Sequence, residues 1–443
     1  MRGVAGEEPL TPETLERLGR ILAGELRAGA GEVAAPQVLV GHDGRESGET
    51  LAAALIAGLN RGGVDVDMVG LAPTPCVACL TAQGPYAAGI VVSASHNPAP
   101  DNGVKLLGAG GAKLDDAVEA RLEAALHEGR LPAEARQAGS QRRVARLVGD
   151  YVAWLRNEAF PDLDLKGWSV VVDTANGACS EVAPRILRAF GAEAIPIHDH
   201  PDGRNINQGC GALHPEVAAQ AVVQQGATAG LSLDGDGDRG LLADTQGRIL
   251  DGDALLAGLA PRLHAAGRLP HGTVVATVMS NLALEQWLAA RGLSLVRTPV
   301  GDRHVAARMR KDGFHLGGEK SGHLLFGPEH DFRGDGLYTF LKAATLLREK
   351  GEDPTALASG YEDLPQDLRN LPVSRRAPLE ELPRLQQAIR EAEKQLAGRG
   401  RTVVRFSGTE LRLRLMVEAD AEDLVRSTLD QLEAAAREEG ILA

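Results

Sequence analysis

The sequence predicts an α/β protein made of three similar α/β units followed by a smaller α+β unit. β-Branched runs alternate with amphipathic helical stretches, and this alternation recurs about every 100 residues. From about Leu364 the spacing of strands and helices becomes typical of a small α+β module, and Pro365, Pro372 and Pro378 precede it. A chain of 443 residues is also too long for one hydrophobic core.

We expect four domains, at residues 1–146, 147–247, 248–363 and 364–443. In the first three, strands are expected at 37–41, 64–69, 89–93, 169–173, 194–197, 228–233, 273–277 and 293–297. The helices expected there are 49–60, about 142–158, 178–190, 282–290 and 303–310. The last domain should contain strands 371–374, 402–406 and 411–417 and helices 379–396 and 421–438.

Composition excludes several classes of function. The net charge of −13 argues against nucleic acid or an anionic membrane as the main partner, although a few arginines could still attract a small anion. The sequence has no uninterrupted apolar run of about 18 residues, so we expect no membrane span. The N-terminus lacks an apolar signal core, so we expect a cytoplasmic protein. Cys76 and Cys79 form a lone C-x-x-C without a second pair, which we interpret as incidental thiols and not a zinc site.

A β-branched run at residues 89–92 ends abruptly in Ser93-Ala94-Ser95-His96-Asn97-Pro98, with a turn-forming segment at 101–103. This pattern predicts a buried strand that presents two serines and a histidine on a rigid loop. Ligands gather at the carboxyl ends of strands in open α/β sheets. An ordinary strand-to-loop turn is the alternative, and other loops decide between the two.

The second loop carries Asp234, Asp236 and Asp238 at alternating positions after another strand. The intervening glycines allow the three carboxylates to converge on one hard cation, and without a cation they would repel one another. An EF-hand calcium site is rejected because Arg239 and Thr245 stand where that loop requires glycine and glutamate. The loop therefore predicts a Mg²⁺ site, with Arg239 placed to meet a phosphate.

Two further loops are weaker signals. Glu319 and Ser321, in the glycine-rich stretch 317–323, could bind neighbouring hydroxyls of a sugar. The segment 405–410, followed by Arg412 and Arg414, combines arginines, hydroxyls and glycine in a pattern that suits a phosphate. Together the four loops supply a hydroxyl carrier, a cation and fixed donors, which phosphoryl transfer on a sugar phosphate requires.

These four motifs occur in the order seen in the α-D-phosphohexomutase superfamily, which the chain resembles over nearly its whole length. Stretches 101–105, 205–211 with 214–216, 277–281 and 300–303 resemble its bacterial phosphoglucosamine mutase branch. The resemblance implies a four-domain architecture, three related α/β domains plus a C-terminal TBP-like α+β domain. It also implies an isomerase that interconverts glucosamine 6-phosphate and glucosamine 1-phosphate for UDP-GlcNAc and cell-wall synthesis. A phosphomannomutase or phosphoglucomutase with the same mechanism is the alternative.

In this resemblance Ser95 is the phosphoserine, and Ser95, Asp234, Asp236 and Asp238 hold one Mg²⁺ per chain. Lys105 and Arg239 assist proton or charge transfer. The substrate-binding residues that it implies are Arg2, His96, Glu319, Ser321, His323, Arg405, Ser407, Gly408, Thr409 and Arg414. The partner is a small-molecule sugar phosphate, with glucosamine 1,6-bisphosphate as intermediate and activator, and a homodimer is left open. The family usually has a Gly-Thr-Asp-Gly segment before the Arg2-Gly3 pair, so we expect either that the start codon is assigned too late or that the first strand is truncated.

Overall fold

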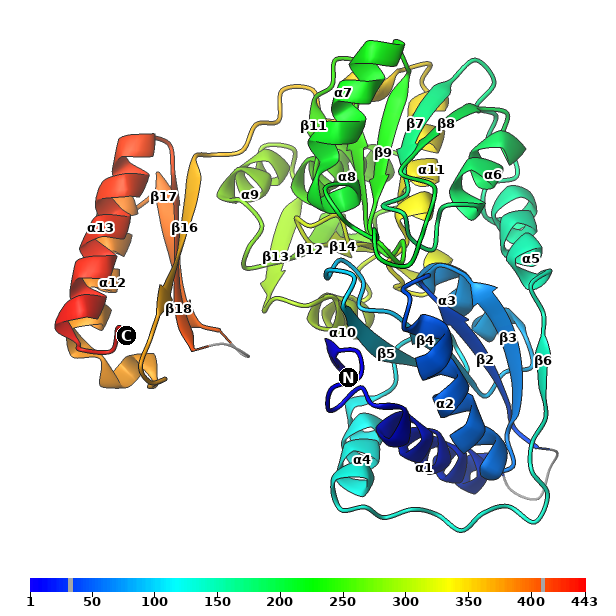
Figure 1. The fold of residues 1–443 in the computed structure, drawn as a ribbon. Helices are drawn as coiled ribbons and strands as arrows, with labels where there is room; N and C mark the ends of the chain where they lie inside the picture. Colours follow the sequence, from blue (N-terminus) through cyan, green and yellow to red (C-terminus); the bar gives the residue numbers. More distant parts are fainter. Residues whose placement is uncertain (31–34, 408–410) are drawn as a thin grey trace.

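The fold is that of a computed structural model, whose described residues are 1–30, 35–407 and 411–443. Four separate sheets divide the chain into four units, which we call domains I to IV in chain order. Figure 1 shows domains I, II and III in one continuous body, with domain IV to one side of it. No helix within these described residues is both long and apolar enough to cross a membrane.

Domain I is built on a six-stranded sheet of order β1-β5-β4-β2-β3-β6. Its strands are β1 Arg2–Val4, β2 Gln37–His42, β3 Asp65–Leu71, β4 Ala88–Val92, β5 Asp101–Gly108 and β6 Gln141–Arg143. Its helices are α1 Pro12–Ala30, α2 Gly48–Arg61, α3 Thr74–Gln83 and α4 Asp116–His127. Strand β4 is buried throughout, as expected for a strand covered on both faces, and it runs parallel to β2.

Domains II and III repeat this plan with smaller sheets, of order β11-β10-β9-β7-β8 and β13-β12-β14-β15. The strands are β7 Ser169–Asp173, β8 Glu193–Ile197, β9 Ala229–Leu233, β10 Gly240–Ala243, β11 Ile249–Leu250, β12 Thr273–Thr277, β13 Ser294–Thr298, β14 Leu316–Gly318 and β15 Leu324–Phe326. The helices are α5 Leu147–Trp154, α6 Val182–Ala189, α7 Pro215–Gln225, α8 Gly252–Ala265, α9 Leu282–Ala289, α10 Asp302–Asp312 and α11 Gly336–Arg348.

Local sequence fixes where the helices of domain III begin. Asp251, Asn281 and Asp335 precede α8, α9 and α11, and each side chain accepts a hydrogen bond from a backbone N–H of the first turn. Such caps satisfy donors that have no partner inside the helix and contribute about 1 kcal/mol each. The caps therefore fix the start of each helix.

Domain IV has a three-stranded antiparallel sheet of order β16-β18-β17, made by β16 Gln366–Pro372, β17 Gly400–Phe406 and β18 Arg412–Ala419. Helices α12 Pro383–Leu396 and α13 Glu422–Glu438 pack on it. Its core, which runs from Val373 to Ile441, contains no residue of the other domains. By contrast, one continuous core joins domains I, II and III, from Leu39 to Tyr361.

The four-unit fold class is confirmed, and three local predictions are wrong. The helix predicted at about 142–158 begins only at Leu147, because residues 141–143 form β6 and Arg142 pairs with Asp67 of β3. The turn predicted at 101–103 is the start of β5, in which Gly103 is required because a Cβ would lie 2.6 Å from the Ser93 carbonyl oxygen. The strand predicted at 371–374 instead ends at Pro372, at an edge position where a missing N–H is tolerated.

Candidate active site

Ser95 lies on the loop that follows β4, and its hydroxyl points at the loop that follows β9. Its Oγ donates a hydrogen bond to Oδ2 of Asp234 at 2.6 Å, and only 3% of the residue is exposed. The backbone of Ser95 has φ +54, the left-handed region that serine rarely adopts. A buried hydroxyl held against a carboxylate by an unusual backbone is typical of a functional position.

The three aspartates of the second loop converge as the sequence predicts. Asp234, Asp236 and Asp238 are buried, and one carboxylate oxygen of each lies within 4.8 Å of the others. Gly235 allows this loop to approach the serine loop, since a Cβ there would lie 2.7 Å from the carbonyl oxygen of Ser95. The two loops come from different domains, so the domain interface itself brings the serine and the carboxylates together.

Lys105 of β5 lies against the same carboxylates, with Nζ 2.5 Å from Asp236 and 2.7 Å from Asp238. Burial alone would lower the pKa of Lys105, but these two carboxylates raise it well above its usual range. Burial and the other two aspartates raise the pKa of Asp234. Asp238 is buried too, yet Lys105 and His323 hold its pKa well below the usual value.

This donor set fits a divalent cation. Oδ1 of Asp236 and Oδ1 of Asp238 are buried without a hydrogen-bond partner among the described residues. The ammonium group of Lys105 shows that a positive charge is accommodated beside the two carboxylates. Three carboxylates and a serine oxygen are hard oxygen ligands of the kind that Mg²⁺ prefers.

His96 and Arg239 contact the serine and aspartate pair. Nδ1 of His96 is 3.5 Å from Oγ of Ser95. Burial, with the positive charges of Arg239 and Arg2, lowers the pKa of His96 to about 4, so its ring is neutral at neutral pH. The backbone N–H of Arg239 donates to Asp234 at 3.1 Å.

Arg2 reaches the serine loop from β1. Its Nη1 donates to Oδ1 of Asn97 at 3.3 Å, and the residue is exposed. Arg2 thus contacts the serine loop from the solvent-exposed surface.

The loop between β14 and β15 contributes His323 and Glu319. The buried His323 ring bridges two carboxylates, with Nδ1 3.6 Å from Asp238 and Nε2 3.5 Å from Asp302. Glu319 accepts a hydrogen bond from the Gly301 N–H at 2.9 Å, and Ser321 is exposed. His323 therefore contacts Asp238 of the aspartate loop directly. Glu319 and Ser321 lie at other positions of the β14–β15 loop.

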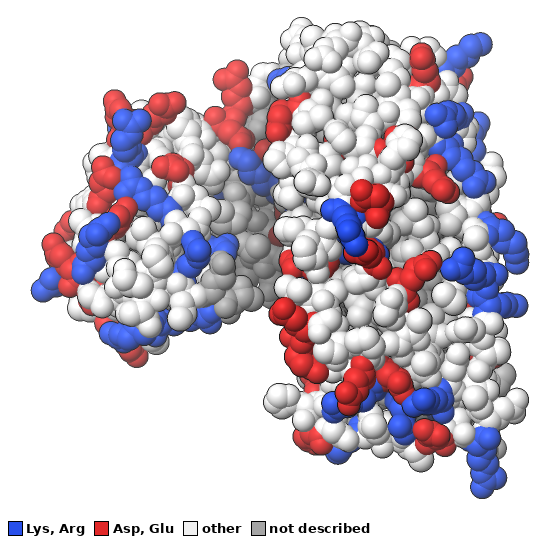
Figure 2. All heavy atoms as spheres, in the orientation of Figure 1, with Lys and Arg blue, Asp and Glu red and all other residues white. Residues whose placement is uncertain are grey.

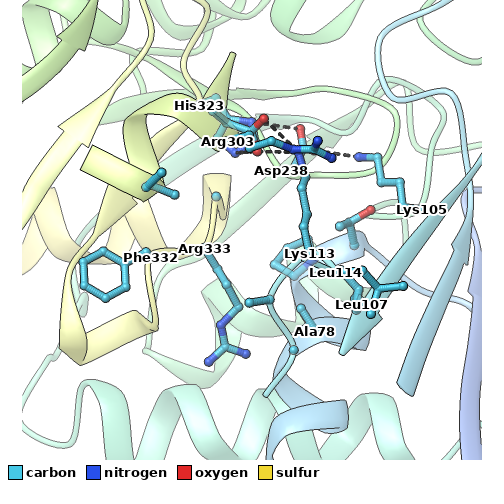
Figure 3. A pocket seen from close by; sticks show the side chains of 18 of the residues that line it. Ala78, Lys105, Leu107, Lys113, Leu114, Asp238, Arg303, His323, Phe332 and Arg333 are labelled. Atoms are coloured by element: carbon cyan, nitrogen blue, oxygen red, sulfur yellow. Dashed lines mark hydrogen bonds and ion pairs between the residues drawn. The ribbon is translucent and has the colours of Figure 1, made fainter. Parts of the chain in front are cut away.

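Beside this centre lies a cavity of about 230 Å³ between domains I and III, shown in Figure 3. Lys105, Asp238 and His323 line one end, where the dashed lines mark their ion pairs. Arg333, Phe332 and Leu114 lie farther from the carboxylates. The cavity shows that side chains do not completely fill the space beside Asp238, Lys105 and His323.

The predicted phosphate residues of domain IV are on a separate body. Arg405 and Arg414 are direct neighbours on β17 and β18. The backbone N–H of Ser407 donates to the carbonyl oxygen of Arg412 at 2.9 Å. Burial and Arg414 lower the pKa of Arg405. Gly408 and Thr409 lie outside the described residues. In Figure 1 the β17–β18 hairpin extends from domain IV toward the other domains.

The surface charge is mixed. Figure 2 shows acidic and basic side chains interspersed over the face of the molecule in view. With a net charge of −13, attraction of a small anion would depend on local basic groups and not on the charge of the whole chain.

A second cluster of metal-ligand types contains Asp173, His198 and Cys210. The Asp173 carboxylate accepts N–H bonds from Ala175 and Gly211 and lies 3.1 Å from the His198 ring. Burial raises the pKa of the Cys210 thiol to about 12. The Asp173 carboxylate already has hydrogen-bond partners, and the Cys210 thiol stays protonated. We therefore interpret this cluster as a structural contact that holds the surrounding loops together.

Several residues around Ser95 and the three aspartates are not among the site residues predicted from the sequence. Thr74 donates its hydroxyl to Asp236, and Asp302 contacts His323. Asp302 and Asn207 belong to stretches singled out by resemblance alone, without a chemical role. Arg45, fully buried beneath the serine loop, has no sequence signal, because a single arginine between Gly44 and Glu46 resembles a surface turn.

Family models for the four phosphoglucomutase/phosphomannomutase domains match this chain in order. Domain I matches residues 1–132, domain II 150–247, domain III 251–364 and the C-terminal domain 368–435. The chain belongs to the phosphohexomutase family. In that family the C-terminal unit is the TBP-like α+β domain that the resemblance implies.

Relatives and solved structures agree with this assignment. The chain is 43% identical over 439 residues to a phosphoglucosamine mutase of Anaeromyxobacter, covering 98% of this chain and 93% of the relative. A phosphoglucomutase/phosphomannomutase family protein of Burkholderia thailandensis has a TM-score of 0.83 at 26% identity, covering 99% of this chain and 96% of that chain. An N-acetylphosphoglucosamine mutase of Aspergillus fumigatus, solved with GlcNAc-6P and magnesium, shares the fold at TM-score 0.60 and 22% identity, covering 87% of this chain and 94% of its own. This phosphohexomutase chain therefore belongs to the phosphoglucosamine mutase branch, a family of isomerases.

Proposed function

We propose that this phosphohexomutase interconverts glucosamine 6-phosphate and glucosamine 1-phosphate through a phosphoserine at Ser95. The observation that carries the proposal is the 2.6 Å hydrogen bond from the Ser95 hydroxyl to Asp234, at the edge of a cluster of three buried carboxylates. A serine hydroxyl is a weak nucleophile at neutral pH and needs an adjacent base or cation. Here the Asp234 carboxylate lies against the hydroxyl, and the three carboxylates would hold a cation beside it. The name of the 43% identical relative supports glucosamine as the sugar.

The proposed reaction has two transfers. In the first, the Oγ–P bond of phosphorylated Ser95 breaks and a bond forms between phosphorus and the O1 oxygen of glucosamine 6-phosphate. The O1 proton leaves to a base, Oγ of Ser95 takes up a proton as the leaving group, and the 1,6-bisphosphate results. The bisphosphate then turns over in the site. In the second transfer its O6–P bond breaks and a bond forms between phosphorus and Oγ of Ser95, which gives up its proton. O6 takes up a proton, and glucosamine 1-phosphate is released.

The charges of the site assign different tasks to neighbouring residues. His96 is neutral at neutral pH and adds no charge to the site, whereas Lys105 is held protonated by Asp236 and Asp238. Lys105 and Arg239 therefore offset the charge of the transferred group and do not act as bases. One Mg²⁺ per chain, held by Ser95, Asp234, Asp236 and Asp238, would supply further stabilisation of the phosphoryl oxygens. The magnesium in the Aspergillus relative supports this assignment.

The intermediate must be held while it turns over. Glu319, Ser321 and His323 would contact the sugar, and Arg405, Ser407, Gly408, Thr409 and Arg414 would bind whichever phosphate is distant from Ser95. Paired arginines suit this task because a guanidinium binds phosphate through two parallel N–H groups. Their position on a separate domain allows them to approach after the substrate has entered.

The test compares three sugar phosphates. Purified protein is incubated with Mg²⁺, a trace of the matching bisphosphate, and glucosamine 6-phosphate, glucose 6-phosphate or mannose 6-phosphate. We expect the highest kcat/KM with glucosamine 6-phosphate and no turnover by the Ser95→Ala variant. Equal or faster turnover of glucose or mannose phosphate would support the phosphoglucomutase or phosphomannomutase alternative. Full activity of Ser95→Ala would overturn the phosphoserine mechanism.

A further inference from the structure

We propose that Arg45 and Asn207 are positioning residues that together hold Ser95 in the geometry of phosphoryl transfer. The inference rests on the proposed function and adds to it two residues outside the expected site. Neither side chain contacts the three carboxylates. Both bind the backbone of the loop that carries Ser95, Arg45 from domain I and Asn207 from domain II.

Arg45 uses its whole guanidinium group on this loop. Its side chain is 0% exposed, and Nε donates to Oδ2 of Asp43 at 2.9 Å. Nη2 donates to the carbonyls of Ser95 at 3.0 Å and Asn97 at 2.8 Å. Nη1 donates to the carbonyls of Pro98 and Asp101. A guanidinium has five N–H groups, so every one of them has an acceptor here.

Asn207 reaches the same carbonyls from the neighbouring domain. Its Nδ2 donates to the carbonyl of Ser95 at 2.9 Å and to that of Asn97 at 3.2 Å. The Asn207 backbone is itself left-handed, with φ +59, and its N–H donates to the Ala175 carbonyl at 2.9 Å. The carbonyl of Ser95 is therefore held by two donors from two domains.

The other side of Ser95 is held by a second pair of bonds. The N–H of Ser95 donates to Oγ of Ser93 at 2.8 Å, and Ser93 donates to Asp43 at 2.6 Å. Asp43 is the partner of Arg45, so one buried network joins the amide before Ser95 to the carbonyl after it. Both peptide groups that set φ and ψ of Ser95 are thus fixed.

Ser95 needs this restraint because its own conformation is unfavourable. A left-handed non-glycine residue costs about 1–3 kcal/mol and persists only when its surroundings determine it. In an ordinary backbone conformation the hydroxyl would leave the position 2.6 Å from Asp234. A displacement of about 1 Å at a reacting group can lower a rate by about 100-fold. The charge of Arg45 also lies under the loop that would carry a phosphoryl dianion.

Lysine cannot replace Arg45 in this role, because one ammonium group does not span four carbonyls and a carboxylate. The first variant is therefore Arg45→Lys, and its matched control is Arg262→Lys. Arg262 is another largely buried arginine that donates to backbone carbonyls, those of Gly258, Leu357 and Ala356, but it lies in domain III away from Ser95. Asn207→Ala is the second variant, and it removes a neutral side chain and leaves the Arg45 network intact.

Each variant is measured for kcat and KM with glucosamine 6-phosphate, at a temperature well below its unfolding midpoint. We expect Arg45→Lys to lower kcat by about 100-fold and Asn207→Ala by about 10-fold, with KM within a factor of about 3 of wild type. Arg262→Lys should keep the wild-type kcat although its unfolding midpoint falls. Unchanged kcat in both Arg45→Lys and Asn207→Ala would overturn the inference. An inactive wild-type protein would instead refute the proposed function.

A metal-free readout separates positioning from catalysis. Hydrogen–deuterium exchange in EDTA should show faster exchange of the 93–102 peptide in folded Arg45→Lys and Asn207→Ala, with the 234–239 peptide unchanged. Wild type and Arg262→Lys should protect 93–102 equally. Wild-type protection of this peptide in both variants would also overturn the inference, even if their rates fall. If Arg45→Lys does not fold, the Asn207→Ala results alone decide.

Discussion

Arg297 of domain III and Arg401 of domain IV donate to the same backbone carbonyl oxygen, that of Ser280, each at 2.6 Å. Arg401 also donates to the carbonyl of Val278 at 3.0 Å and forms an ion pair with the buried Glu418. Burial and the neighbouring Arg401 lower the pKa of Arg297. Two like charges on one acceptor are tolerated here because Glu418 offsets them, so this contact links domain IV to domain III.

The Arg401→Ala variant should loosen this attachment. Without Arg401 the sheet of domain IV loses its charged hydrogen bonds to domain III, each of which contributes about 1.5–3 kcal/mol. We expect a larger radius of gyration in small-angle scattering and a KM raised about tenfold, equivalent to about 1.4 kcal/mol of lost substrate binding. Arg399→Ala is the control, because among the described residues the Arg399 side chain forms its ion pair with Asp420, within domain IV. An unchanged radius and KM in Arg401→Ala would contradict this role.

Lys105→Met should make stability depend more strongly on Mg²⁺. The variant leaves Asp236 and Asp238 buried without their ammonium partner, a change that costs on the order of 3–5 kcal/mol. A cation that binds only the folded state restores stability as its concentration rises. Thermal unfolding with EDTA and with Mg²⁺ should show a lower midpoint in EDTA and a larger gain on adding Mg²⁺ than in wild type. Lys113→Met, at an exposed ion pair with Asp302, should show neither effect.

Gly235→Ala tests the contact between the serine loop and the metal loop. The new Cβ would lie 2.7 Å from the Ser95 carbonyl oxygen and 2.8 Å from Nδ2 of Asn207, so backbone must move. We expect a loss of about 1–3 kcal/mol in the free energy of unfolding, measured with urea, and a loss of mutase activity. Gly29→Ala in α1 is the control, because nothing lies within 4 Å of its Cβ. That change should stabilise the helix by about 0.5–1 kcal/mol.

Asp253 predicts a pH dependence of stability. Burial, with the charge of Asp251, raises the pKa of Asp253 from 3.8 to about 7. Between these values the folded protein binds a proton at Asp253 that the unfolded chain has lost, so the free energy of unfolding falls as pH rises from about 4 to 7. Asp253→Asn resembles the protonated carboxyl and should remove this part of the decline, leaving the variant more stable than wild type at pH 8.

The measurement is urea unfolding at pH 5 and pH 8. Asp420→Asn is the control, since Arg399 lowers the pKa of that exposed carboxyl and it is ionised in both states over this range. A decline in Asp253→Asn as steep as in wild type would show that other groups cause it.

The fold was predictable from sequence wherever periodicity is strong. The strands of residues 169–173 and 273–277 are found at the predicted bounds, because buried parallel strands are continuous apolar runs between turn residues. Strand β6 was not predictable, since Gln141–Arg143 is polar and exposed and depends on pairing with β3. Strand β5 was not predicted, because Asn102 and Gly103 at its start have turn propensity, which pairing with β1 overrides.

The candidate site divides in the same way. Ser95 and the three aspartates stand in short motifs, and the structure brings them together. Arg45 and Asn207 act on backbone carbonyls, and no residue pattern reveals which carbonyls a distant side chain will meet. The roles of Glu319, Ser321 and the domain IV residues stay predictions, because they concern contacts with a substrate.

Domains I, II and III share one core, whereas domain IV has a core of its own, and this difference has a consequence for synthesis on the ribosome. The core shared by domains I, II and III includes Tyr361, so the serine loop cannot be backed by its complete core until more than four-fifths of the chain has been made. The C-terminal core, from Val373 to Ile441, is local in sequence and can close quickly after release. Nascent chains stalled before Tyr361 should therefore depend on chaperones far more than chains stalled after it, and the last unit emerges onto a body that is already assembled.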